Sequence, residues 1–243
     1  MRVDGRNHDE LRKVEMTLGF NPYAEGSCLI KSGNTHVICT ASVEEKVPSW
    51  LKDSGKGWIT AEYAMLPRAT QTRVPRESKK PSGRSEEIKR LIGRALRGGV
   101  DLTKMPDISI TIDCDVIQAD GGTRTSSITG GFVALYQALD KLVKGGVLAE
   151  NPVREFVAAV SCGICNGKAV LDENYDEDSN AQADTNFVLT ENGGIIEVQG
   201  TAEGEPISDK QFAELMALAK KGIAELIAKQ KQVLGVEKNG KNY

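Results

Sequence analysis

The stretch from Ile108 to Val116 alternates strictly between apolar and polar residues, a period of two that is typical of a β-strand with one buried face. Two glycines, Gly121 and Gly122, follow this stretch. From about Thr125 to Lys144 the apolar residues then recur at helical spacing. The sequence therefore predicts a strand, a glycine turn and a long helix in direct succession. The helical side chains predicted to face inward are Phe132, Leu135, Leu139 and Leu142.

Two hairpins are predicted, one on each side of this unit. The first pairs residues 27–31 with 36–43 across a turn at Gly33 and Asn34, and the second pairs 186–190 with 195–200. Their similar outline favours two related halves, at roughly 1–150 and 151–235. A flexible tail is expected at 236–243.

Two more helices complete the prediction. One begins at Ser85 as N-cap, and its inward residues are Ile88, Leu91, Ile92, Ala95 and Leu96. Its remaining surface is expected to carry Lys89, Arg90, Arg94 and Arg97. The last runs from about 209 to 233 on Phe212, Leu215, Ala219, Ile223 and Leu226. Hairpins with interposed helices favour an α+β fold, a mixed sheet layered with helices, over a parallel Rossmann order.

The composition is that of an ordinary globular chain, since 243 residues with 40% hydrophobic and 27% charged content can bury a substantial core. No apolar stretch approaches the roughly 20 residues that cross a bilayer. The segment 1–6 is too polar for a signal peptide. We therefore expect a cytoplasmic protein without a membrane partner.

Five cysteines without secretion signals do not suggest a disulfide framework. Cys162 and Cys165 match a CxxC pattern, but they belong to an apolar run from Phe156 that is typical of a buried strand. Free cysteine packs like a small apolar residue, so both are predicted to be part of the core rather than a metal or redox pair.

The charges are distributed unevenly, although the net charge is only −3. From Arg68 to Arg97 ten Lys or Arg residues stand against three Glu, whereas Ala169 to Asp209 contains eleven Asp or Glu and no Lys or Arg. The first zone suits a polyanion and the second suits cations.

Three segments could support chemistry. Between Cys114 and Thr129, a glycine turn before a helix, with Arg124 beside it, is typical of an anion site, although glycine turns with Ser and Thr caps are common. Arg68, Arg73 and Arg76 occupy a proline-punctuated loop that could follow a nucleic-acid backbone or could simply be solvated. The acidic segment 176–184 could hold Mg²⁺ or face solvent. Together they indicate phosphoryl transfer on a polyanion.

The residues also carry a resemblance that spans nearly the whole chain. Long segments resemble the bacterial ribonuclease PH family, which trims transfer RNA 3′ ends with inorganic phosphate. These segments are 1–6, 57–68, 87–97, 113–129 and 197–204. The resemblance implies a phosphorolytic 3′-5′ exoribonuclease, a tRNA nucleotidyltransferase that removes nucleotides following the CCA end, releases nucleoside 5′-diphosphates, runs in reverse and also trims ribosomal RNA precursors.

The resemblance also implies a fold, an assembly and roles for single residues. The fold is a duplicated βαβ core of the ribosomal protein S5 domain 2 type, assembled as a homohexamer, a trimer of dimers. Phosphate is bound by Arg84, Gly122, Thr123 and Arg124, and catalytic Mg²⁺ by Asp178 and Asp184. RNA, not DNA, is contacted by Arg68, Arg73 and Arg76.

The chain departs from the family pattern at three places. The segment 78–83 looks short, Gln182 stands where relatives often carry an acid, and Cys162 and Cys165 are peculiar to this chain. Three rival functions stay open: a non-catalytic RNA-binding ring subunit, a hydrolytic metal nuclease that releases monophosphates, and a structural protein of this fold.

Overall fold

The structure, a computed structural model, describes residues 2–76 and 82–236. The segment 78–83, which looks shorter than the family pattern, therefore lies mostly outside the described residues. The same holds for almost all of the predicted tail, 236–243. Val236 is described, and its backbone N–H donates to the Lys231 carbonyl at 3.0 Å.

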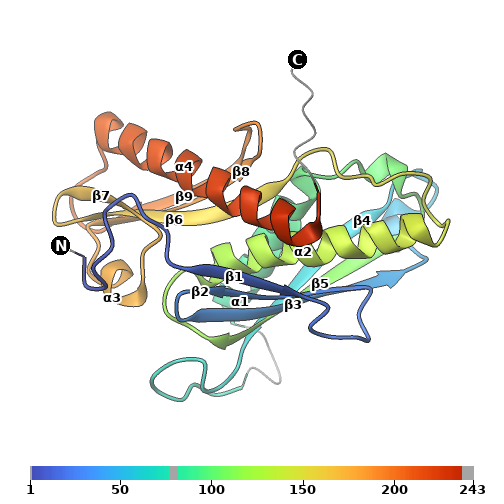
Figure 1. Ribbon diagram of the computed structural model, residues 1–243, viewed down its shortest axis with the longest axis horizontal. Helices are drawn as coiled ribbons and strands as arrows, with labels where there is room; N and C mark the ends of the chain where they lie inside the picture. The colour runs from blue at the N-terminus through green and yellow to red at the C-terminus, as the bar shows by residue number, and fades with distance from the viewer. Residues whose placement is uncertain (1, 77–81, 237–243) are drawn as a thin grey trace.

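The N-terminal part of the chain forms a five-stranded sheet of order β1-β2-β3-β5-β4 (Figure 1). Neighbouring strands are antiparallel except β4 and β5, which run parallel. The predicted first hairpin is confirmed, since β2 and β3 pair from Gly26 opposite Ala41 to Ser32 opposite Thr35. The strands are β1 (Val14–Leu18), β2 (Gly26–Ser32), β3 (Thr35–Glu44), β4 (Trp58–Met65) and β5 (Ser109–Gln118).

A second, four-stranded antiparallel sheet follows, with the order β7-β6-β8-β9. The predicted second hairpin is confirmed as β8 and β9, which pair from Ala183 opposite Ala202 to Leu189 opposite Ile195. The strands are β6 (Val157–Cys165), β7 (Lys168–Leu171), β8 (Ala183–Thr190) and β9 (Ile195–Ala202).

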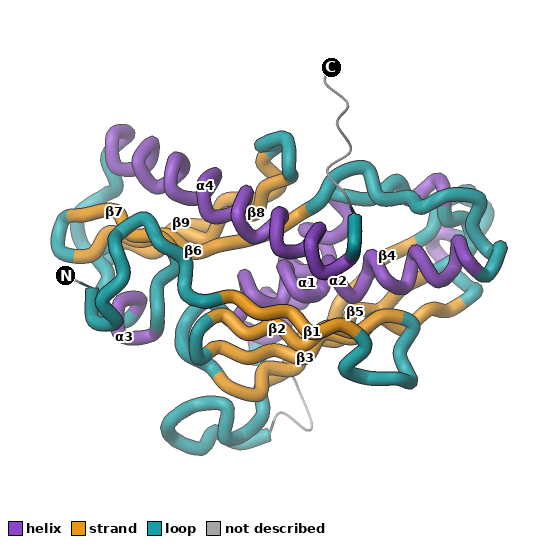
Figure 2. The backbone as a smooth tube through the Cα atoms, viewed as in Figure 1, coloured by secondary structure: helices purple, strands orange, loops and turns teal. Residues whose placement is uncertain are grey.

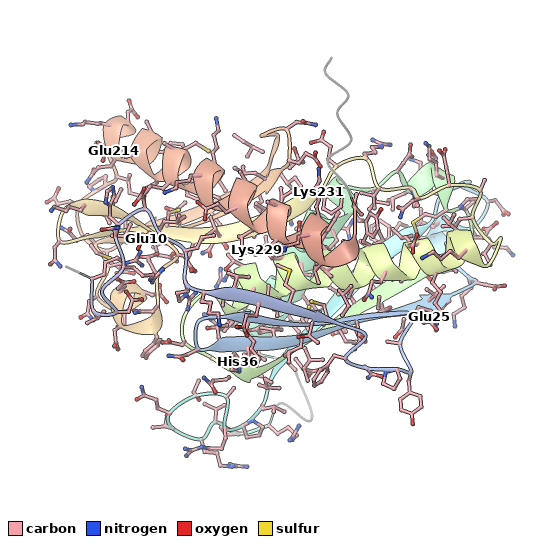
Figure 3. The ribbon with its side chains drawn as sticks, viewed as in Figure 1. Glu10, Glu25, His36, Glu214, Lys229 and Lys231 are labelled. Carbon is pink, nitrogen blue, oxygen red and sulfur yellow. The ribbon has the colours of Figure 1, made fainter. Side chains whose placement is uncertain are left out.

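Helices cover one face of each sheet and fill the space between the sheets. Figures 1 and 2 show α2 between the two sheets and α4 across the four-stranded sheet, and α2 packs against β2, β3 and β6. Lys229 and Lys231 lie near the end of α4 that passes over α2 (Figure 3). The helices are α1 (Gly83–Gly98), α2 (Thr123–Lys144), α3 (Tyr175–Asp178) and α4 (Asp209–Leu234), with short 3-10 turns at Ser49–Leu51 and Leu102–Lys104.

The buried face of α2 is the one that the sequence predicts, because the four apolar residues expected to face inward are all buried. The helix begins two residues earlier than predicted, at Thr123. All five apolar residues expected inside α1 are buried as well.

Three details of the helix predictions are wrong. The N-cap of α1 is Ser82, whose side chain accepts from the backbone N–H of Ser85, so Ser85 lies buried in the first turn. Arg97 is only partly exposed, because its guanidinium lies 4.2 Å from the centre of the Trp58 ring and donates to the Ile59 carbonyl. Phe212, in the first turn of α4, is 41% exposed.

The two cysteines of the CxxC pattern lie on β6, three residues apart. Side chains at odd spacing on a strand point to opposite faces, so the two thiols do not converge on one ion. Cys162 is buried as predicted, whereas Cys165 is only half-buried. Burial raises the pKa of Cys165 to about 12, which keeps this thiol protonated.

Candidate active site

The start of α2 forms a cradle for an anion. Its N-cap is Gly122, which lies in the left-handed region at φ 65° and has no side chain to accept from the first N–H groups. The nearby hydroxyls are directed elsewhere, because Thr125 donates to the Gly122 carbonyl and Ser127 to the Thr123 carbonyl. The first N–H groups of the helix, which receive no side-chain cap, and the helix dipole therefore favour an anion over the alternative of a side-chain cap.

Gly121 brings this cradle against residues 173–175, which lead from β7 into the acidic segment. Its φ is +74°, and a Cβ there would lie 2.7 Å from the Asn174 carbonyl carbon and 2.9 Å from the Tyr175 nitrogen. Only glycine allows this approach. Residues distant in sequence thus become two walls of one site.

A buried ion pair fixes the same junction from behind. Arg12 donates to both carboxylate oxygens of Asp172, at 2.7 and 3.1 Å, and also to the carbonyls of Asp120 and Gly121. Burial acts to raise the pKa of Asp172, but the charge and hydrogen bonds of Arg12 more than offset it, and the pKa is lowered. Arg12 therefore joins the glycine turn to the acidic segment.

An arginine of the N-terminal segment neutralises part of the charge of the acidic segment. Arg2 pairs with Glu177 at 2.6 Å, and both side chains are nearly buried. Because Asp172 and Glu177 are paired with arginines, not every acid of this segment is available to bind a cation. Asp178, which is exposed, and Asp184 have no such pairing among the ion pairs of the described residues.

A cleft of about 400 Å³ lies between these walls. Six residues predicted from the sequence line it together: Arg84, Gly122, Thr123 and Arg124, with Asp178 and Asp184. The structure thus places the expected phosphate ligands and the expected metal ligands around one space. Glu173, Tyr175 and Asn186 also contribute to the lining.

Arg124 is held in place by neighbours that the sequence did not indicate. Its guanidinium donates to Gln199 Oε1 at 2.7 Å and lies 3.5 Å from Glu87 Oε1. Gln199 in turn donates to Glu87 at 3.1 Å. At the cradle itself, the Tyr63 hydroxyl lies 2.9 Å from Thr123 Oγ1.

The carboxylates of the cleft are unusual in their protonation. Burial and the nearby charge of Asp178 raise the pKa of Asp184 to about 6. Burial and the charges of Asp184 and Asp178 raise the pKa of Glu173 to about 9. Hard oxygen ligands that repel one another fit Mg²⁺. Within residues 2–76 and 82–236, however, no three His, Cys, Asp or Glu side chains are arranged to hold a metal ion by themselves.

The loop arginines do not reach the cleft. Arg68, Arg73 and Arg76 are exposed on the loop between β4 and α1, which Figure 1 shows in teal below the five-stranded sheet. Thr70, from the same loop, does line the cleft. The loop is tied to the sheet because the Ala119 N–H donates to the Ala69 carbonyl at 2.8 Å.

Sequence reasoning missed Arg12, Tyr63, Glu173 and Gln199. Arg12 carries no local signal, because it acts through partners distant in the chain, whereas Tyr63 lies within the segment 57–68 that supports the family resemblance. Glu173 lay within the acidic zone, but nothing in the sequence separates it from the paired acids beside it. Gln199 lies within a segment that supports the family resemblance, which was its one available signal.

The fold and the cleft define a phosphoryl-transfer enzyme that acts on a polyanion, since an anion cradle faces carboxylates across a space bordered by basic residues. Sequence profiles of the 3′ exoribonuclease family match the chain, domain 1 at residues 10–139 and domain 2 at 155–222. The chain belongs to this family.

The chain is similar over nearly its full length to proteins named ribonuclease PH. That of Rhodospirillum rubrum is 59% identical, with 96% of this chain and 98% of the relative covered. That of Methylobacterium nodulans is 56% identical, with 97% and 100% covered. The resemblance to ribonuclease PH is confirmed, and with it the prediction of a phosphate-dependent 3′ exoribonuclease that processes tRNA 3′ ends.

Solved structures share the fold. The Archaeoglobus fulgidus exosome, with RNA bound to its active site, aligns with a TM-score of 0.80 at 26% identity, covering 94% of this chain and 92% of that chain. Rice Rrp46 aligns with a TM-score of 0.78 at 18% identity, covering 96% and 100%. The predicted α+β fold of the ribosomal protein S5 domain 2 type is confirmed. None of the described helices has the length and apolarity to span a membrane.

Proposed function

We propose that the cleft between α2 and the acidic segment is where this exoribonuclease cleaves RNA by phosphorolysis. Arg84, Gly122, Thr123 and Arg124 bind the attacking phosphate. The observation that supports this assignment is that a cationic cradle at a helix start and the carboxylates of Asp178 and Asp184 line the same cleft. A hydrolytic nuclease does not require the cradle.

The chemistry of the chain's own residues is positioning and charge neutralisation. The N–H groups at the start of α2 and the guanidinium groups of Arg84 and Arg124 hold orthophosphate beside the last phosphodiester. An oxygen of this phosphate forms a bond to the phosphorus while the bond to the 3′ oxygen of the preceding nucleotide breaks. That oxygen takes up a proton and becomes the new 3′ end. The terminal nucleotide leaves as a nucleoside 5′-diphosphate, and the reverse reaction extends the RNA.

Asp178 and Asp184 are the residues that would hold Mg²⁺. When bound there, the ion supplies positive charge beside the non-bridging phosphate oxygens. Mg²⁺ typically takes one or two protein carboxylates and completes its shell with water and substrate. The absence of a complete three-residue ligand set among the described residues is therefore compatible with this assignment.

Substrate binding beyond the cleft is assigned to the loop between β4 and α1. Arg68, Arg73 and Arg76 are exposed and can contact phosphates of the tRNA body without reading its sequence. We propose that ribosomal RNA precursors are also substrates.

The remaining expectations concern assembly, location and organisation. We propose a homohexamer built as a trimer of dimers, a cytoplasmic location, and two related halves that divide near residue 150. The last proposal is supported by the two separate sheets, each of which contains one of the matching hairpins.

One assay tests the proposed reaction. A tRNA precursor with extra 3′ nucleotides is incubated with the enzyme, with and without phosphate, and the released nucleotides are identified. We expect nucleoside diphosphates that appear only with phosphate. Monophosphates, or activity indifferent to phosphate, would support the hydrolytic alternative. No release under either condition would support the non-catalytic or structural alternatives.

Two substitutions separate the cradle from the loop. Arg124→Ala should abolish turnover and leave tRNA retention on a gel largely unchanged, because Arg124 contacts phosphate in the cleft. Arg73→Ala should weaken tRNA binding and reduce its salt dependence by about one ion, with phosphate saturation unchanged. Wild-type turnover in Arg124→Ala would show that the cradle is assigned to the wrong residues.

A further inference from the structure

The start of α2 carries four hydroxyl side chains, and three of them already donate within the protein. Thr125 and Ser127 donate to backbone carbonyls of the same turn, and Ser126 donates to Ser32 Oγ at 3.2 Å. Ser and Thr near a helix start commonly make such local bonds. Thr123, the first residue of the helix, differs, because among the described residues its hydroxyl has one partner, a side chain of the five-stranded sheet.

That side chain is Tyr63 of β4. It is 5% exposed and lies opposite Cys114 in the parallel pairing of β4 with β5. Because the two strands run in the same direction, their carboxyl ends meet at one edge of the sheet, where the glycine turn leads into α2. The phenol therefore reaches Thr123, which is 60 positions away in the sequence, and the two hydroxyl oxygens lie 2.9 Å apart.

Burial decides which of these two hydroxyls donates. Tyr63 is buried, and Thr123 Oγ1 is the one hydrogen-bond partner of its phenol among the described residues. If Thr123 were the donor, the phenol hydrogen would be buried without an acceptor, which costs free energy. If Tyr63 is the donor, the remaining hydrogen belongs to Thr123, which lines the cleft. Only the second arrangement leaves no buried donor unpaired.

The phenol also lies close to the two arginines of the cradle. Burial raises the pKa of Tyr63, while the hydrogen bond with Thr123 and the charges of Arg84 and Arg124 act in the opposite direction. The pKa is raised as a result, so the phenol keeps its hydrogen at neutral pH and can donate it. The pair of hydroxyls and the two arginines therefore belong to the same wall of the cleft.

We propose that Tyr63 is a positioning residue for the attacking phosphate. Its phenol donates to Thr123 Oγ1 and so directs the Thr123 hydrogen into the cleft, where this hydrogen is donated to a phosphate oxygen. The inference rests on the proposed function, because it needs phosphate at the start of α2. A donor that is already oriented loses less freedom when the anion binds than a hydroxyl that rotates. Tyr63 thus strengthens phosphate binding without touching the phosphate.

The test is equilibrium dialysis of the enzyme against radiolabelled orthophosphate, with no RNA present. Thr123→Val keeps the shape of the side chain and removes a hydroxyl that donates to a charged ligand, so binding should weaken about 10- to 100-fold. Tyr63→Phe leaves the Thr123 hydroxyl without its orienting donor, and we expect binding to weaken about three- to tenfold. Thr123→Ser keeps the hydroxyl and should bind within about twofold of the wild type. Binding by Thr123→Ser as weak as that of Thr123→Val would overturn the inference.

Tyr136→Phe is the matched control. It removes a phenolic hydroxyl from the same helix, where the ring centres of Tyr136 and Phe156 lie 5.4 Å apart, and should leave phosphate binding within about twofold of the wild type. A loss equal to that of Tyr63→Phe would overturn the inference.

The kinetics of phosphorolysis with saturating RNA supply a second readout. Tyr63→Phe should raise the KM for phosphate by the factor by which it weakens binding, with kcat changed less than about twofold. The reason is that the hydrogen bond to phosphate is made equally before and during the reaction. A fall in kcat with an unchanged KM would overturn the inference.

The double variant Tyr63→Phe/Thr123→Val separates positioning from a general loosening of α2. Because Tyr63 acts through Thr123, the double variant should bind phosphate as Thr123→Val does. A further loss in the double variant would overturn the inference. Wild-type binding in Tyr63→Phe, with weak binding in Thr123→Val, would overturn it and leave the cradle in place.

The comparison with Arg124→Ala distinguishes failure of the inference from failure of the proposed function. If Thr123→Val binds phosphate as the wild type does and Arg124→Ala does not, the inference alone is overturned. If both variants bind phosphate as the wild type does, the proposed cradle fails together with the inference.

Thermal unfolding without phosphate tests the direction of the hydrogen bond. Thr123→Val leaves the buried phenol of Tyr63 without an acceptor, so it should unfold at a lower temperature than the double variant, in which both hydroxyls are absent. Tyr63→Phe alone should lower the unfolding temperature by about 2–4 °C. A double variant that unfolds below Thr123→Val would overturn the assigned direction and the inference with it.

Discussion

The ion pair of Arg12 and Asp172 offers the sharpest test of how the site is assembled. Arg12 is 6% exposed and Asp172 is 5% exposed, and the pair includes two side-chain hydrogen bonds. Arg12→Met removes the close partner of Asp172 and leaves this buried charge with Arg6, whose guanidinium lies 3.6 Å away. Breaking a buried pair from one side costs about 3–5 kcal/mol of unfolding free energy. For a chain of this size that corresponds to a fall of roughly 6–20 °C in unfolding temperature.

A substitution of the second partner, Asp172, tests whether the two side chains stabilise the protein as a pair. Asp172→Asn keeps a residue that tolerates the left-handed backbone at this position. In the double variant both charges are gone, so its loss of stability should be clearly smaller than the sum of the two single losses. Urea unfolding followed by circular dichroism measures all three. Strict additivity, or a loss below about 1 kcal/mol in Arg12→Met, would refute the assigned role of the pair.

Arg12→Met should also weaken phosphate binding, because Arg12 donates to the carbonyls of Asp120 and Gly121 in the glycine turn. Without these bonds the carbonyl of Gly121 loses a donor and the cradle is held less firmly, so the KM for phosphate should rise in Arg12→Met. Lys13→Met is the control, because the Lys13 side chain is 83% exposed. It should change neither the unfolding curve nor the KM.

Three other predictions use the same assays. Gly121→Ala should destabilise the protein and raise the KM for phosphate, whereas Gly146→Ala, with the same φ of 74° but no neighbouring atoms within 4 Å, should show only the backbone cost of about 1 kcal/mol or slightly more; equal effects would contradict the close approach. Gln199→Leu removes a hydrogen bond to charged Arg124 and should raise the KM for phosphate about tenfold, with a smaller change in kcat; an unchanged KM would show that Arg124 needs no such support. Because the pKa of Asp172 is lowered in the folded protein, its contribution to stability is present above the ordinary aspartate value of 3.8 and is lost as the pH falls further, so urea midpoints should drop more steeply in acid for the wild type than for Asp172→Asn.

Local patterns were sufficient to predict the cradle and most of the elements. Strict alternation before Gly121 and helical spacing after Gly122 specify a strand, a turn and a helix by interactions between near neighbours. The start of α1 was misplaced because Ser82 and Ser85 are chemically equivalent caps, and only the folded chain shows which one accepts from the helix. Phe212 was expected to face inward because its position fits the helical period of α4. The period does not reveal that the first turn of α4 is partly uncovered, and the ring centres of Phe212 and Phe187 lie 6.1 Å apart.

The acidic segment shows the limit of sequence reasoning most clearly. From the local pattern alone, the acids of the zone from Ala169 to Asp209 suit cations without distinction, and only the family resemblance singles out Asp178 and Asp184. In the fold, arginines more than 150 positions away neutralise Asp172 and Glu177, while Asp178 and Asp184 line the cleft without an arginine partner among the ion pairs of the described residues. The choice among them depends on which side of β7 and α3 meets the N-terminal segment.

The sequence by itself determined the strand, glycine turn and helix that line the cleft, the basic character of the loop and, through the family resemblance, the reaction. These depend on contiguous residues, whose backbone geometry and charge can be read locally. Only the tertiary structure decided that Gly121 contacts residues 173–175, that Gln199 and Glu87 hold Arg124, and that Glu173 lines the cleft beside Asp184. Each of these facts depends on packing between two sheets, where burial and electrostatics are set by residues that no local pattern connects.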